Sequence, residues 1–309
     1  TINGSLINDV NGFIDTSNTL TIGGTGSIDT KNSFTNSGSM TVNNVFTHDS
    51  GVLTNTGSIT NNGTFINKSS MTTNIFDNNN TFKIFNNASL TVYVSGILTN
   101  TTASTFINYG GITNGGTITN NSTMKNYRTM TISENGSLVN TLNFTNYQPN
   151  PSTPDTTGDG INLTGVTPII TNNGTIRHTS GELINKGTIN TTKSIKLDNL
   201  YTNSGILTNS NKIRINSTGT LNNSGTLNNL SNDSTLITNY GLLSNLIVSN
   251  TEKGQIANNG RILNGTTGTL KNYHIFTNDS SVINNNIFKN FLVGTITNNR
   301  TIENHLTLD

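Results

Sequence analysis

Few side chains in this 309-residue sequence are placed to perform acid–base or metal chemistry. The best acidic cluster is Asp155-Thr-Thr-Gly-Asp159-Gly, whose two carboxylates could bind calcium. A full calcium site needs six or more oxygen ligands, which this segment does not supply. We therefore interpret the segment as a solvated turn, and we keep Asp155 and Asp159 only as candidate metal ligands.

The other reactive residue types are not arranged as in a catalytic site. The four histidines stand apart in the sequence and have no cysteine partners, which argues against zinc: His48, His178, His274 and His305. The fifteen acidic residues are scattered, whereas a polysaccharide lyase or hydrolase gathers carboxylates on one face. The sequence predicts no catalytic residue and no cofactor, and hence a protein that is not an enzyme.

Charge and hydropathy exclude two further classes of partner. The net charge is +1, and the basic residues are spread out, so we expect no binding to nucleic acid. One mild basic concentration, interpreted as a solvated face, contains Lys193, Lys196, Lys212 and Arg214. No apolar run approaches the roughly 20 residues that a membrane span needs.

The tyrosines provide a candidate binding surface. Five of the seven follow an asparagine, and Tyr109, Tyr127 and Tyr147 are 18 and 20 residues apart. If equivalent positions recur once per coil, these three rings form an exposed aromatic stripe. Two interpretations remain open: the rings pack on one another and stiffen a corner, or they contact a sugar or a neighbouring fibre.

The composition indicates what kind of framework carries these residues. There are 59 Asn and 56 Thr but only 3 Ala and 2 Gln, and 30% of residues are hydrophobic. Asn bonds its own backbone in turns, while abundant Thr, Ile and Val favour strands over helices. We expect order that relies on regularly repeated main-chain hydrogen bonds.

A six-residue repeat explains this composition. Large apolar residues recur every six positions in two long runs: Leu53, Ile59, Phe65 and Met71, then Phe106, Ile112, Ile118, Met124 and Met130. In most copies an Asn stands two positions after the apolar residue. In a strand, alternation turns the apolar residue and Asn to one side and the intervening Thr or Ser to the other. Because Asn and Gly accept unusual backbone angles, a corner follows each short strand.

This pattern predicts an all-β fold, a single-stranded parallel β-helix (β-solenoid) with about 18–20 residues per coil. The apolar positions should be buried: Ile59, Phe65, Ile112, Ile118, Ile176, Ile189 and Leu227. The inward asparagines should lie at corners, with their amides stacked in ladders between coils or bonded to backbone: Asn55, Asn61, Asn114, Asn120, Asn172 and Asn185.

The prolines suggest how the chain is divided. All four lie close together: Pro149, Pro151, Pro154 and Pro168. Residues 148–160 also lack the six-residue repeat. We predict a first solenoid half over 1–147, a Pro-rich loop or hinge over 148–168, and a second half over 169–309. One continuous solenoid with an excursion is favoured over two solenoids joined by a linker.

The run Leu53-Thr-Asn-Thr-Gly-Ser-Ile59-Thr-Asn-Asn-Gly-Thr-Phe65 and its copies resemble the repeats of filamentous haemagglutinin and autotransporter-type surface adhesins. The resemblance covers most of the chain. It implies a right-handed coil, favoured here over a left-handed one, and an exported protein that attaches or serves as a stalk. There is also a hexapeptide likeness to left-handed β-helix acyltransferases, and no functional residue is carried over from either family.

The sequence therefore favours a non-enzymatic structural or adhesive β-solenoid, extracellular or on the cell surface, as a fibre, stalk or filament subunit. A start at Thr1 suggests processing or trimming. Expected partners are further copies, end to end or laterally, or host or surface carbohydrate. The alternatives are an ice- or polysaccharide-binding solenoid with a flat Thr-rich face, and then a polysaccharide lyase or hydrolase.

Overall fold

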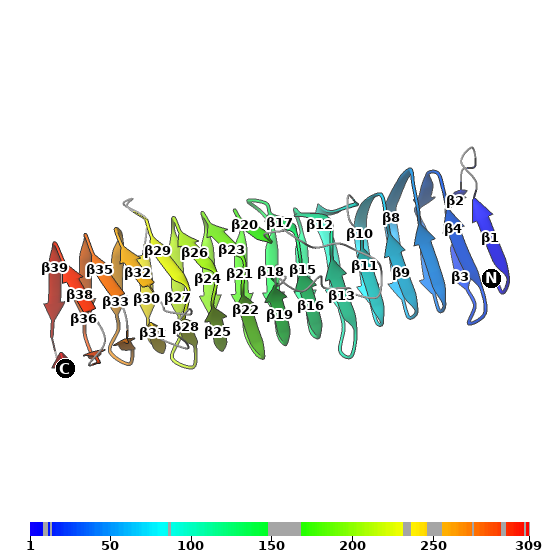
Figure 1. Ribbon diagram of the computed structural model, residues 1–309. Helices are drawn as coiled ribbons and strands as arrows, with labels where there is room; N and C mark the ends of the chain where they lie inside the picture. The colour runs from blue at the N-terminus through cyan, green and yellow to red at the C-terminus, as the bar shows by residue number, and fades with distance from the viewer. Residues whose placement is uncertain are drawn as a thin grey trace, which may run out of the picture. The chain divides into compact units, whose positions relative to one another are not determined.

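The computed structural model describes residues 1–8, 12, 14–85, 88–147, 168–230, 236–245, 255–273, 275–291, 295–305 and 307–308. These residues form 40 strands and no helix (Figure 1). The strands pair in parallel and wind into a β-solenoid of about 13 turns, with about 20 residues per turn. The predicted all-β parallel solenoid is confirmed.

By their contacts the described residues divide into two compact units. The first contains Thr1–Val139 and Pro168, and the second contains Asn140–Tyr147 and Ile169–Asp309. Residues 140–147 belong to the second unit because β19 (Asn143–Asn146) pairs with β22 (Glu182–Asn185). Apart from Pro168, the predicted loop or hinge over 148–168 lies outside the described residues.

In the first unit each coil places one strand, or part of one, on each of three faces. The first face contains β1 (Ser5–Asn8), β4 (Ser27–Thr30), β7 (Val45–His48), β9 (Thr64–Asn67), β11 (Thr81–Ile84), β13 (Thr105–Asn108) and β16 (Thr123–Asn126). The second face contains β2 (Ile14–Thr16), β5 (Phe34–Asn36), β14 (Gly111–Asn114) and β17 (Thr129–Ile132). The third contains β3 (Thr19–Ile22), β6 (Ser39–Val42), β15 (Thr117–Asn120) and β18 (Ser137–Asn140), of which only Asn140 belongs to the second unit. Three longer strands run from the second face to the third: β8 (Val52–Asn61), β10 (Ser70–Asn78) and β12 (Ser89–Asn100).

The second unit repeats the same three-faced coil. Its first face contains β19, β22, β25 (Leu200–Asn203), β28 (Thr220–Asn223), β31 (Leu242–Asn245), β34 (Thr269–Asn272), β37 (Ile287–Asn290) and β40 (Thr307–Leu308). The second contains β20 (Ile169–Asn172), β23 (Thr188–Thr191), β26 (Ile206–Asn209), β29 (Thr226–Asn229), β32 (Gln255–Asn258), β35 (Ile275–Asn278) and β38 (Thr295–Asn298). The third contains β21 (Thr175–His178), β24 (Ser194–Leu197), β27 (Lys212–Ile215), β30 (Leu236–Asn239), β33 (Arg261–Asn264), β36 (Ser281–Asn284) and β39 (Thr301–Asn304).

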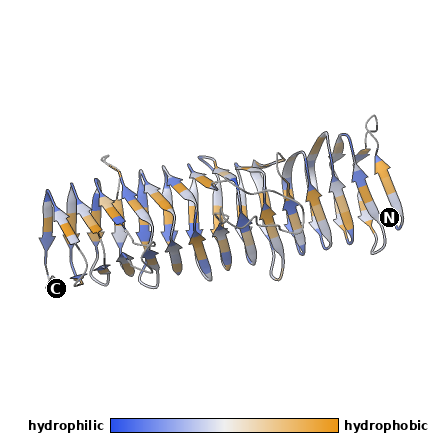
Figure 2. Cartoon of the chain, in the orientation of Figure 1, coloured by the Kyte–Doolittle hydropathy of each residue, from blue (hydrophilic) through white to orange (hydrophobic). Residues whose placement is uncertain are grey.

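The core follows from the alternation along each strand, visible as apolar bands across the strands (Figure 2). All seven predicted inward residues are at most 2% exposed: Ile59, Phe65, Ile112, Ile118, Ile176, Ile189 and Leu227. Each lies in register with an apolar residue of an adjacent coil, as Ile118 does with Leu98. Phenylalanines use the same register to stack, and the rings of Phe82 and Phe106 are 4.8 Å apart. The predicted core is confirmed.

The last residue of most strands is a buried asparagine whose amide bonds to the next coil. Asn61, Asn78, Asn100 and Asn120 form one such ladder, with N···O distances of 2.7–2.8 Å. Each amide also reaches main chain, and Nδ2 of Asn100 donates to the carbonyl of Thr123 at 3.0 Å. The six predicted residues are all fully buried and hydrogen-bonded, so the prediction is confirmed: Asn55, Asn61, Asn114, Asn120, Asn172 and Asn185. Asn114 bonds to main chain, because its register neighbours Val92 and Ile132 are apolar.

Two histidines occupy ladder positions in place of asparagine. Nε2 of His178 donates to the carbonyl of Leu200 at 2.8 Å, so Nδ1 is left to accept from Asn140 at 3.0 Å. His48 does the same between Thr30 and the carbonyl of Ser70. Burial lowers the pKa of both rings below 6.5 and keeps them neutral, as a ladder position requires.

The corners between the third and first faces of the second unit differ in length, from two to four residues. Residues 216–219 and 265–268 form four-residue turns, closed by bonds from Gly219 to Asn216 and from Gly268 to Gly265. The corner between them, Tyr240 and Gly241, has only two residues. A Cβ on Gly241 would lie 2.1 Å from the carbonyl oxygen of Gly219, so this corner must be glycine to fit beneath its neighbour.

Candidate binding surfaces

The tyrosine stripe differs from its prediction. Tyr109 and Tyr127 are only 2% and 5% exposed, and their rings stack at 5.0 Å with an interplanar angle of 27°. Their expected exposure was wrong, because rings on adjacent coils lie close enough to cover each other. Tyr147 is half-buried, and Nζ of Lys186 lies 5.5 Å from its ring.

The other candidate residues form no metal centre in the part of the chain that the structure describes. No group of three or more His, Asp or Glu side chains comes together there. Asp155, Asp159 and His274 lie outside the described residues. His305 is exposed and lies 3.8 Å from Glu303, a surface pair.

The third face of the second unit carries an outward column of basic residues. Arg177, Lys196 and Arg214 occupy equivalent positions on β21, β24 and β27 and lie in register. Adjacent strands are about 4.8 Å apart, so these like charges are close to one another. The same three residues and Lys212 line a hollow of about 220 Å³.

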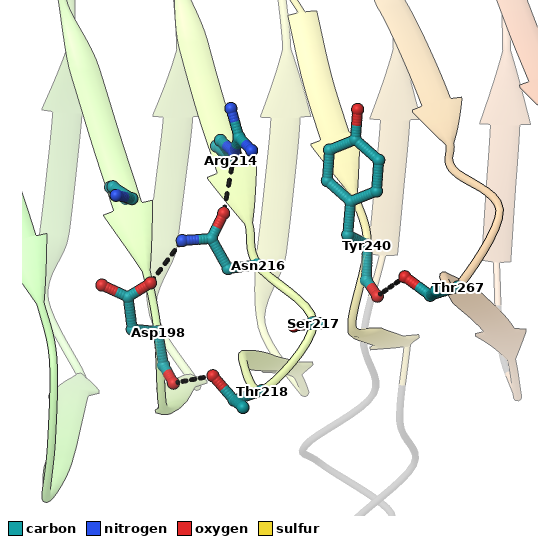
Figure 3. A pocket seen from close by; sticks show the side chains of 8 residues that line it. Asp198, Arg214, Asn216, Ser217, Thr218, Tyr240 and Thr267 are labelled. Carbon is teal, nitrogen blue, oxygen red and sulfur yellow. Dashed lines mark hydrogen bonds between the residues drawn. The ribbon is translucent and has the colours of Figure 1, made fainter.

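Arg214 is held in one orientation by two contacts (Figure 3). Its Nε donates to Oδ1 of Asn216 at 2.7 Å, and its guanidinium carbon lies 5.3 Å from the centre of the Tyr240 ring. The ring in turn lies against Gly265, where a Cβ would come within 2.5 Å of it. Within the described residues the two terminal nitrogens of Arg214 have no acceptor.

Asp198 supplies the negative charge in this cluster. Its carboxylate accepts from Nδ2 of Asn216 and lies 3.5 Å from Nε of Arg177. Both carboxylate oxygens are therefore engaged, one with the amide and one with Arg177. Among the described residues, Lys196 has no ion-pair partner, so the charges of Lys196 and Arg214 are not compensated.

A groove crosses the corner next to these cations. On the third-face side it is a hollow of about 540 Å³, lined by Lys196, Arg214, Tyr240 and the turn hydroxyls. On the first-face side it continues as a hollow of about 520 Å³, lined by Lys271 and Lys289. Both hollows share Ser217, Thr218 and Thr267, so we treat them as one corner groove.

The walls of the corner groove are the two four-residue turns, and its floor is the shorter corner. Thr218 Oγ1 donates to the carbonyl of Asp198, and Thr267 Oγ1 donates to the carbonyl of Tyr240, each at 2.7 Å (Figure 3). These bonds fix each threonine against the preceding coil. The difference in corner length therefore creates the groove.

Sequence reasoning identified only part of this surface. It grouped Lys196, Lys212 and Arg214 but interpreted them as a solvated face, and it missed Arg177, Asp198 and Tyr240. A signal was present: Arg177, Lys196 and Arg214 each directly follow an inward isoleucine, at intervals of 19 and 18 residues. Lys271 and Lys289 are likewise in register on β34 and β37.

The first unit presents outward threonines instead. On its second face six of them lie in register without interruption: Thr35, Thr54, Thr72, Thr91, Thr113 and Thr131. Its third face has a similar column, broken by Asp77: Thr21, Thr41, Thr60, Thr99 and Thr119. These side chains are partly or fully exposed, so a methyl and a hydroxyl repeat at each coil.

Comparisons of the chain with family models, with curated proteins and with solved structures give no significant match. The described residues contain no helix with the length and hydropathy of a membrane span. The fold and its outward side chains are therefore the features that bear on function.

Proposed function

We propose that the chain is a non-enzymatic, extracellular β-solenoid with a structural or adhesive role, of the filamentous-haemagglutinin or autotransporter type. The observation that carries this proposal is the contrast between inside and outside. Nearly every coil repeats the same apolar and amide interior, whereas the outward column of the third face changes from threonine in the first unit to basic residues on β21, β24 and β27 in the second. Such a scaffold is suited to presenting side chains at a fixed spacing.

Carbohydrate on a host or other surface is the partner that these columns suit best. They offer hydroxyls, amides and cations at a regular interval, and a polymer with a regular repeat can meet several of them at once. Lateral or end-to-end association of further copies is compatible with the same columns.

The proposal is tested with beads coated with the full chain, allowed to settle on films of different polysaccharides. We expect attachment to at least one film, and beads coated with the heat-unfolded chain serve as the control. Electron microscopy of the same preparation records rods or filaments. Absence of both attachment and self-association would contradict an adhesive or structural role, and so would release of new reducing ends from any film.

A second candidate function is favoured by the unbroken threonine column of the first unit. A flat array of methyl and hydroxyl groups could match an ordered lattice such as ice or a crystalline polysaccharide. Thermal hysteresis of the full chain measures ice binding. Replacing Thr72 and Thr91 by Lys should abolish any hysteresis, whereas replacing Thr208 on β26 by Lys should not.

A further inference from the structure

We propose that the corner groove binds a linear polysaccharide whose sugars carry carboxylates. The inference rests on the proposed adhesive function and names the ligand class of one surface. Its starting point is the pair of uncompensated cations, Lys196 and Arg214, on adjacent strands. A carboxylate placed between them would remove the repulsion that two like charges in register impose.

Arg214 is oriented for such a ligand before it binds. Its Nε–H donates to Asn216, and its guanidinium group lies over Tyr240. The edge formed by the two terminal nitrogens therefore remains available to a ligand. A planar fork of N–H donors matches the two oxygens of a carboxylate, and such bidentate pairs are among the strong hydrogen bonds of proteins. Little rotamer entropy would be lost on binding.

The middle of the groove suits a sugar ring. Ser217, Thr218 and Thr267 are exposed there. The hydroxyls of Thr218 and Thr267 already donate to main-chain carbonyls, so their remaining lone pairs can accept from sugar hydroxyls. The groove is therefore polar and shallow, as a carbohydrate contact surface requires.

The far end of the groove points to a polymer. Lys271 and Lys289 lie in register on the first face and line the same groove as Lys196 and Arg214. A single organic acid would reach the cations at only one end of the groove. A chain of uronic acid residues would place a carboxylate at each end and neutral sugar atoms between the turns.

Nucleic acid fits the groove less well. Proteins that bind single strands stack bases on open aromatic faces. Here Arg214 lies over the ring of Tyr240 and the Gly265 backbone lies against the same ring, so the ring is only partly exposed.

The test uses the full chain and polygalacturonic acid, with fully methyl-esterified polygalacturonic acid as the uncharged counterpart. Binding is measured by titration calorimetry at an ionic strength of about 0.15 M. We expect the acid to bind and its methyl ester not to bind. The double variant Lys196→Gln, Arg214→Gln should weaken binding about tenfold or more, since charged hydrogen bonds are lost.

A matched control removes the same charge elsewhere. Lys31→Gln combined with Lys125→Gln, both in the first unit, should change binding by less than about twofold, because screened distant charges contribute little. Circular dichroism verifies that each variant keeps its melting temperature. For a smaller perturbation, Lys271→Gln alone should also weaken binding.

The inference is overturned if the methyl ester binds as well as the acid, or if both double variants weaken binding equally. It is also overturned if dextran sulfate or DNA binds as tightly and competes, because the groove would then be an unselective polyanion surface. Unchanged binding by the groove variants, in a chain whose beads still attach to polysaccharide, refutes the groove and leaves the adhesive function standing. Cleavage of polygalacturonic acid would instead refute the proposed function.

Discussion

Nδ1 of His178 accepts a hydrogen bond from Nδ2 of Asn140 at 3.0 Å, while its Nε2–H donates to the carbonyl of Leu200. The imidazole thus continues the relay of acceptor and donor that an asparagine amide provides elsewhere in the solenoid. Protonation would place a second N–H on Nδ1, facing the N–H of Asn140. A ladder containing His178 is therefore compatible only with the neutral ring.

The first prediction follows from this donor–acceptor arrangement. The pKa values of His48 and His178 are lowered by burial from 6.5, so below pH 6.5 the unfolded chain takes up protons that the folded chain does not. The free energy of unfolding should be level above this pH and should fall as the pH decreases towards the folded pKa values. Urea denaturation between about pH 8 and pH 5 measures it.

A matched pair of variants isolates the effect. His178→Asn restores the usual ladder residue and should reduce the pH dependence, whereas His305→Asn, at an exposed position, should leave it unchanged. An unaltered dependence in His178→Asn would show that other groups cause it.

The second prediction concerns an amide ladder in the first unit. Asn120 accepts from Nδ2 of Asn100 at 2.7 Å and donates to the carbonyl of Ser122 at 3.0 Å. Replacing Asn120 by Leu should lower the free energy of unfolding by about 1–3 kcal/mol despite added hydrophobicity, because buried polar groups lose partners. A higher urea midpoint would contradict the role of the ladder, and outward Thr119→Leu is the control.

A third prediction is that Tyr201→Phe stabilises the protein. The Tyr201 hydroxyl is fully buried with no hydrogen-bond partner among the described residues, and burial raises its pKa so that it stays neutral. Removing it should raise the free energy of unfolding by about 1 kcal/mol or more. Tyr93→Phe, at an exposed position, should change it by no more than about 0.5 kcal/mol in urea denaturation.

The fourth prediction replaces the idea of an exposed aromatic stripe. Tyr109→Ser and Tyr127→Ser should each lower the melting temperature, because each removes a buried ring and one half of a stacked pair. The double variant should cost less than the sum of the singles, since the stack is lost only once. Additive effects in thermal unfolding would indicate that the rings do not support one another.

Strand alternation was sufficient to predict which residues face inward, because in each coil it assigns residues such as Ile118 and Asn120 to the same side. It did not predict exposure at the corners. Tyr109 and Tyr127 were expected to be exposed, but rings in register on adjacent coils cover each other. A side chain that points outward can therefore still be buried, because adjacent coils are closer together than the length of a tyrosine side chain.

The corner groove depends on the lengths of individual corners, which the six-residue pattern does not predict. It exists because two four-residue turns flank Tyr240 and Gly241, and alignment of the coils requires knowing where those extra residues fall. At some ladder positions an apolar residue replaces the asparagine, as at Ile84, Val92 and Ile132. The Asn pattern of the sequence does not predict these replacements. Both features become clear only once the strand register is known.

The asparagine ladders give the solenoid a sense of direction. In every described Asn–Asn rung between residues that end strands, Nδ2 of the earlier residue donates to Oδ1 of the later one, as from Asn185 to Asn203 and from Asn203 to Asn223. The exposed corner asparagines Asn43, Asn62 and Asn79 bond in the opposite direction. A second bond to a carbonyl of the later coil, such as that from Asn203 to Thr226, fixes which end of the amide is nitrogen. The amide dipoles therefore point one way and polarise one another along the stack. A coil could be duplicated, deleted or transplanted between such proteins in its native polarity, but a coil inserted upside down would set donor against donor at each rung.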